Sequence, residues 1–189
     1  MIVIGILGDI GSGKSYVAKQ FGYPVFDADN EVNKIYRNNL SCFRKLKKIL
    51  PKYIKSYPIN KIELMNSILA KKTNLKKITE IVHPIVRIKM NLFLTKNKNK
   101  KIVVLDIPLL LENKIYNKNM LLVYVESKKS DILKRIEKRK NFNKKLFKQF
   151  KKIQLSLDYK KKKSNFIIKN NFTKKSVKNG IKNILSNII

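Results

Sequence analysis

The eight residues GDIGSGKS, at positions 8–15, constrain the fold of this chain more than any other stretch. They match the pattern Gly-x-x-x-x-Gly-Lys-Ser in full and directly follow the apolar run MIVIGIL. Glycines allow the left-handed backbone that turns successive N–H groups toward phosphate oxygens, and the N-terminus of a following helix favours the same anion. The stretch therefore predicts a buried strand, a phosphate-binding loop and a helix, in that order.

Two side chains of this loop have predicted chemical roles. Lys14 would reach the β- and γ-phosphates of a nucleotide, and the Ser15 hydroxyl would hold Mg²⁺. The alternative is a strand–turn–helix connection without a ligand, although a chance match to the whole pattern is rare. No Asn-Lys-x-Asp motif occurs, and no Asp-x-x-Gly follows the second strand, so the sequence argues against a GTPase. A kinase for a small metabolite remains.

Short apolar runs alternate with longer helical stretches along the chain. This alternation, with the first strand leading into a glycine loop, is typical of an α/β fold with a doubly wound parallel sheet. We expect a parallel five-stranded sheet flanked by helices, with strands at residues 1–7, 23–26, 101–107, 121–126 and 166–168.

The remaining stretches have helical periodicity. Helices are expected at 16–21 and 177–188, and several short helices between about Asn30 and Lys98 would be broken by Pro51 and Pro58. The basic stretch from Ser130 to Lys163 predicts a helical hairpin that bends near Lys140–Asn143.

Three aspartates lie at or just after the ends of predicted strands, at the sheet edge where doubly wound proteins bind ligands. Asp27 or Asp29 could accept the proton of an attacking hydroxyl, or Asp29 or Asn30 could simply cap the next helix. Asp106 lies near the end of the run KIVVLDI, where a carboxylate would help to hold hydrated Mg²⁺. Its alternative role is that of a buried structural carboxylate.

His83 is the only histidine and lies in an apolar helical stretch, where packing is a more common role than catalysis. Arg135 and Arg139 are four residues apart, so on one helix they would share a face and could clamp phosphates. A solvated basic face is the alternative for this pair.

The net charge of +32 suggests nucleic acid as a partner, but only five of the 44 basic residues are arginines. Lys, Asn and Ile can all be encoded by A/T-only codons, so we attribute the charge to genome composition and expect no nucleic-acid partner. The apolar runs are too short to span a bilayer, and no basic segment precedes the first one as in a signal peptide. The single cysteine, Cys42, agrees with a reducing cytosol, so we expect a cytoplasmic protein. We also expect a monomer.

Five blocks of the sequence occur in the order and spacing of a known family. The blocks GILGDIGSGKS, FDAD, HPIVR, VVLDIPLLLE and RIEKRK span most of the chain. Together they resemble the motifs of dephospho-CoA kinases, and the pair HPIVR and DIPLLLE is more specific than the P-loop.

The resemblance implies an enzyme that transfers the γ-phosphoryl group of ATP to the ribose 3′-hydroxyl of dephospho-CoA, with Mg²⁺. It implies a P-loop core at about 1–29, 90–129 and 164–189, an inserted helical CoA-binding region at about 30–89, and a lid at about 130–163. By the same resemblance, the catalytic residues are Asp29, Lys14 and Arg139; ATP is bound by Ile10, Gly11, Ser12, Gly13, Lys14, Ser15 and Asn170; the substrate contacts are Asp27, His83 and Arg87; and the metal ligands are Ser15 and Asp106.

The chain departs from this pattern at two positions, one just before the loop and one within it. Leu7 replaces a threonine, and Asp9 replaces a glycine. We expect the charge of Asp9 to weaken polyphosphate binding unless the side chain points to solvent. Three alternatives stay open: a nucleoside monophosphate kinase of the same core fold, a basic P-loop protein that binds nucleic acid, and an inactive relative of the kinases.

Overall fold

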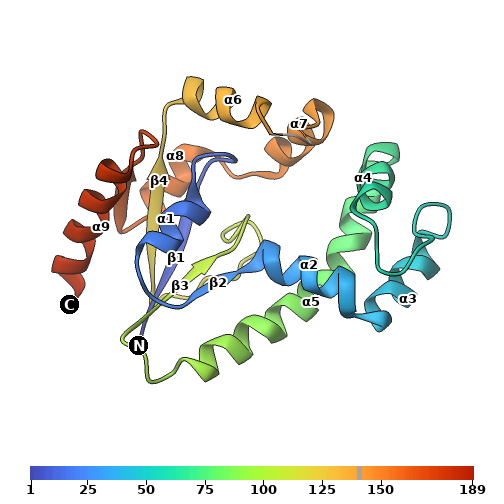
Figure 1. Ribbon diagram of the computed structural model, residues 1–189, viewed down its shortest axis with the longest axis horizontal. Helices are drawn as coiled ribbons and strands as arrows, with labels where there is room; N and C mark the ends of the chain where they lie inside the picture. The colour runs from blue at the N-terminus through green and yellow to red at the C-terminus, as the bar shows by residue number, and fades with distance from the viewer. Residues whose placement is uncertain (140–141) are drawn as a thin grey trace. The chain divides into compact units, whose positions relative to one another are not determined.

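The computed structural model describes residues 1–139 and 142–189 and divides into two compact units (Figure 1). The first unit contains Met1–Asp27, Asn97–Phe142 and Lys151–Ile189. The second contains Ala28–Lys96 and Asn143–Phe150. The phosphate-binding loop and the sheet belong to the first unit, and the long helical insertion forms most of the second.

The first unit is built on a parallel sheet of five strands, as the sequence predicted. Within the sheet the strands lie in the order β2-β3-β1-β4-β5. β1 is central because its run of apolar residues can be buried on both faces. All five residues of β3 are buried for the same reason. The strands are β1 (Ile2–Gly8), β2 (Val25–Asp27), β3 (Ile102–Asp106), β4 (Met120–Glu126) and β5 (Phe166–Lys169).

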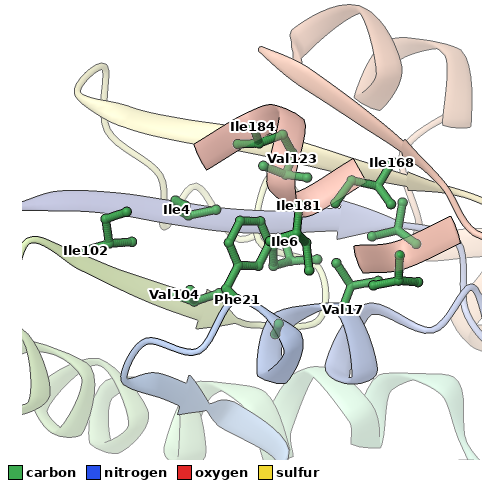
Figure 2. Packing of buried hydrophobic residues seen from close by; sticks show 13 residues of the cluster. Ile4, Ile6, Val17, Phe21, Ile102, Val104, Val123, Ile168, Ile181 and Ile184 are labelled. Atoms are coloured by element: carbon green, nitrogen blue, oxygen red, sulfur yellow. The ribbon is translucent and has the colours of Figure 1, made fainter. Parts of the chain in front are cut away.

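Helices α1 (Lys14–Gln20) and α9 (Lys174–Ile188) pack on this sheet. Val17 and Phe21 from the α1 segment meet Ile181 and Ile184 of α9 over the buried strand residues (Figure 2). This core keeps the end of β1 and the start of α1 in place, and the phosphate-binding loop connects the two.

The second unit consists of helices. α2 (Ala28–Asn38), α3 (Leu40–Ile49) and α4 (Lys61–Ala70) all contact α5 (Lys72–Lys96). The predicted interruption at Pro51 and Pro58 is confirmed, because both lie between α3 and α4.

Helix α5 is longer than the expected short helices, since it continues for 25 residues through Pro84. Pro84 is exposed, while Ile78, Val82, Val86 and Met90 recur every four residues on the buried side of the helix. Packing along that stripe compensates for the hydrogen bond that proline removes.

The basic stretch differs from the predicted hairpin, because it contains α6 (Lys129–Glu137), α7 (Lys144–Ile153) and α8 (Leu157–Lys163). The additional helix start is explained by Ser156, whose side chain accepts a hydrogen bond from the amide of Tyr159. The expected bend near Lys140–Asn143 includes residues 140 and 141, which lie outside the described residues. Among the described helices, none is long and apolar enough to cross a membrane.

Two adjacent isoleucines of β5 provide a test of the core. Ile168 is fully buried and Ile167 is 43% exposed. We expect Ile168→Ala to lower the free energy of unfolding by about 2–5 kcal/mol, because it leaves a cavity under α9. Ile167→Ala in the same strand should cost less than about 1 kcal/mol. Urea denaturation measures both, and equal losses would contradict this description of the core.

Candidate active site

The loop between β1 and α1 has a backbone that only glycine tolerates at two positions. Gly11 and Gly13 have φ angles of 87° and 92°, in the left-handed region. A Cβ atom on Gly11 would lie 2.6 Å from Cδ1 of Ile136, and one on Gly13 would lie 2.5 Å from Nδ2 of Asn170. Both the left-handed backbone and the close packing against Ile136 and Asn170 therefore require glycine at these two positions.

Side chains from the ends of two other strands hold this loop through one carbonyl. The Ser12 carbonyl accepts hydrogen bonds from Nδ2 of Asn170, at 2.8 Å, and from Oγ of Ser127, at 3.0 Å. Oδ1 of Asn170 accepts the amide of Phe172 at 2.9 Å. Asn170 is buried, and both ends of its amide are used within the protein, so in this structure it positions the loop.

Lys14 curves back over the loop that carries it. Its Nζ donates to the carbonyl oxygens of Asp9, at 2.8 Å, and of Gly8, at 3.3 Å. The ammonium group thus lies at the loop, as the motif predicts, and phosphate oxygens can replace these carbonyl oxygens as acceptors.

Asp9 does not point to solvent, because its side chain is only 9% exposed. Nζ of Lys151 lies 2.5 and 2.6 Å from its two carboxylate oxygens, and the amide of Ile10 donates to the carboxylate at 2.6 Å. Nε2 of Gln154 donates to the neighbouring Gly8 carbonyl at 3.3 Å. The negative charge in the loop is therefore paired, an arrangement that the sequence-based expectation did not include. Leu7, the other unusual residue, is buried in β1.

Asp106 and Asp27 end neighbouring strands and are partners in the register of β2 and β3. The pKa of Asp106 is raised above the ordinary carboxyl value, chiefly by burial and to a smaller extent by the charge of Asp27. A hydrogen bond from Ser15 and the charge of Lys14 act in the opposite direction and lower this pKa. The structure thus brings the two predicted metal ligands, Ser15 and Asp106, into direct contact.

These two oxygen donors fit Mg²⁺. The ion prefers hard oxygen ligands, and it commonly takes one or two from protein while phosphates and water complete its shell. Within the described part of the chain, no three His, Cys, Asp or Glu side chains gather into a metal site of their own.

The two arginines of the basic stretch are placed differently from each other. Arg139 lies beyond the end of α6, so the expected shared helix face is wrong. Like charges four residues apart disfavour a longer helix, which agrees with the end of α6 at Glu137. The Arg135 guanidinium lies 4.2 Å from the ring centroid of Phe172, and that ring is next to Gly13.

Asp29, His83 and Arg87 belong to the second unit. α2 begins at Ala28, so Asp29 is an exposed residue of the first helical turn rather than the residue that precedes the helix. His83 is half-buried in α5, one turn before Arg87, and burial together with the Arg87 charge lowers the pKa of this imidazole. The fold joins the two elements, since α2 packs on α5 and Glu31 pairs with Lys89 at 3.5 Å.

Sequence reasoning did not find Lys151, Ser127 or Phe172. Lys151 is one basic residue among 44, and no motif distinguishes it from its neighbours. Ser127 and Phe172 reach the loop only because the parallel sheet brings the ends of β4 and β5 beside the end of β1. The sole available signal was position in the sequence, since Ser127 directly follows a predicted strand and Phe172 lies a few residues after another.

The comparisons with known proteins agree with the motif order. The family model described as dephospho-CoA kinase matches residues 2–176. The chain belongs to the dephospho-CoA kinase family. A dephospho-CoA kinase of Wolbachia pipientis is 33% identical over 99% of this chain and 98% of its own length. A dephospho-CoA kinase of Ehrlichia canis is 29% identical over 100% of this chain and 96% of its own length.

Solved structures show the same fold. A protein of Thermus thermophilus superposes with a TM-score of 0.76 at 24% identity, covering 100% of this chain and 98% of its own. A dephospho-CoA kinase from Campylobacter jejuni has a TM-score of 0.65 at 23% identity, with coverages of 98% and 96%. Members of this kinase family and the present chain therefore share one architecture.

The buried Asp106 generates a prediction about pH. Because its pKa is raised, the folded state keeps a proton at pH values where the unfolded state has lost it, so its contribution to stability falls as pH rises through that range. We expect Asp106→Asn to melt at a higher temperature than wild type at pH 7, with a smaller difference near pH 4. Its kinase turnover should also fall if Asp106 is the metal ligand that the sequence predicts. A lower melting temperature at pH 7 would contradict the burial penalty.

Proposed function

We propose that this protein transfers the γ-phosphoryl group of ATP to the ribose 3′-hydroxyl of dephospho-CoA, producing coenzyme A and ADP. The observation that carries the proposal is the match to the dephospho-CoA kinase family over residues 2–176, together with a complete phosphate-binding loop. The curated relatives named dephospho-CoA kinase extend over nearly the whole chain. This coverage favours the same activity here.

ATP would bind with its β- and γ-phosphates in the loop from Ile10 to Ser15. Lys14 would exchange the carbonyl oxygens of Gly8 and Asp9 for phosphate oxygens. The flat pair formed by Arg135 and Phe172 lies beside Gly13 and offers a stacking surface for the adenine ring.

Ser15 and Asp106 would hold Mg²⁺ at the edge of the sheet. Mg²⁺ there would neutralise charge that develops on the β- and γ-phosphate oxygens. The raised pKa of Asp106 means that its carboxylate form is incompletely compensated by the protein alone, which favours a cation at this position.

The acceptor hydroxyl would lose its proton to Asp29, which the FDAD motif singles out. The hydroxyl oxygen forms the new bond to the γ-phosphorus, and the bond from that phosphorus to the bridging oxygen breaks and leaves ADP. Asp27 would orient the acceptor, and His83 and Arg87 would bind dephospho-CoA from α5. Arg139 would approach the phosphates as part of the lid, residues 130–163, which would exclude water.

The first test measures ADP release from ATP and Mg²⁺ with dephospho-CoA, AMP, CMP or no acceptor. We expect turnover with dephospho-CoA alone, and none for Lys14→Ala, which retains the fold but lacks the phosphate-binding ammonium. Preferential turnover with AMP or CMP would instead indicate a nucleoside monophosphate kinase. No turnover with any acceptor would reject the proposed activity.

The role of Asp29 has its own test. Asp29→Asn should lower kcat by about 10²–10⁴-fold, because it removes the general base, while the melting temperature changes little. Asp131→Asn is the matched control, since Asp131 is also an acidic residue in a first helical turn. If Asp29→Asn kept its kcat and lost stability to the same degree as the control, Asp29 would be a helix-stabilising residue only.

A further inference from the structure

The pair formed by Asp9 and Lys151 links the phosphate-binding loop to helix α7. Asp9 lies between two ammonium groups: its carbonyl accepts from Lys14, and its carboxylate binds Lys151. At the same end of α7, Gln154 donates to the Gly8 carbonyl. The last turn of α7 and the residue that follows it therefore contact two consecutive loop residues.

A buried carboxylate within a phosphate-binding loop opposes the binding of a polyphosphate. Asp9 is 9% exposed, so water screens its charge only weakly, and each phosphate added to the ligand increases the repulsion. The Lys151 side chain contacts Asp9 through its ammonium group and is 35% exposed, so it is partly accessible to solvent. The ammonium can therefore cancel the carboxylate charge when phosphates are present.

We propose that Lys151 is a positioning residue of the phosphate site, which neutralises Asp9 and so permits ATP to bind. The proposal rests on the proposed function only in taking a nucleotide polyphosphate as the ligand of the loop, whatever the acceptor. Lys151 matters here because this chain carries Asp9. Removal of both charges should therefore restore the site that removal of Lys151 alone damages.

A clamp that only holds α7 against the loop is the competing explanation. A clamp would affect every ligand of the loop equally, whereas charge compensation depends on the number of phosphates. The affinity ratio between wild type and variant should thus increase from AMP to ADP to ATP. This dependence is a readout that a purely structural role does not change.

The experiment measures dissociation constants for AMP, ADP and ATP by displacement of a fluorescent ATP analogue. The proteins are wild type, Lys151→Met, Asp9→Asn, the double variant, and Lys152→Met as a control at an exposed neighbour on α7. We expect Lys151→Met to weaken ATP about tenfold or more, and AMP by less than about threefold. The double variant and the control should bind ATP within about twofold of wild type.

Three results would overturn the proposal. Equal losses for AMP, ADP and ATP in Lys151→Met would indicate a clamp. A double variant as weak as Lys151→Met would show that Asp9 is not the charge being neutralised. Asp9→Asn should bind ATP at least as tightly as wild type, because Lys151 then faces the phosphates without a carboxylate partner. Weaker binding of ATP by Asp9→Asn would reject the proposal. This outcome can be measured even if Lys151→Met fails to fold. If wild type bound ATP normally but did not turn over dephospho-CoA, that result would contradict the proposed acceptor and leave the role of Lys151 in ATP binding intact.

Discussion

The site depends on one buried acceptor, the carbonyl oxygen of Ser12. A loop that directs its amides toward an anion cannot satisfy itself with regular secondary structure, so its shape has to be held from outside. Asn170 and Ser127 hold it by donating to this carbonyl from the ends of β5 and β4. The parallel sheet matters for function because it brings the carboxyl ends of those strands to the same edge as the loop.

Two buried carboxylates at this edge are stabilised in different ways. Asp9 has a direct cationic partner, whereas Asp106 has a hydroxyl donor, nearby Lys14 and a raised pKa. Pairing with Lys151 neutralises the charge of Asp9, which would otherwise repel phosphate. Among the described residues Asp106 has no such direct ion pair, so its carboxylate can bind a cation. The same residue type therefore serves opposite electrostatic purposes within one small site, according to its partners.

Much of the fold could be predicted because its signals are local. The strands are short apolar runs, and Pro51 and Pro58 separate helices as expected. The errors arose where packing or charge overrides local preference. α5 continues through Pro84 because a long buried stripe stabilises it, and α6 ends before Arg139 in a run of like charges. The capping alternative for Asp29 also assumed a later start of α2 than the structure has.

By itself, the sequence determined the phosphate-binding loop, the order of strands and helices, and the family, because spacing along the chain carries all three. The tertiary structure alone decided which distant side chains complete the loop. Asn170 lies 158 residues from its partner Ser12, and Lys151 lies 142 residues from Asp9. No local pattern distinguishes Lys151 from the other lysines, since its role comes from a buried negative charge that only the folded chain places beside it.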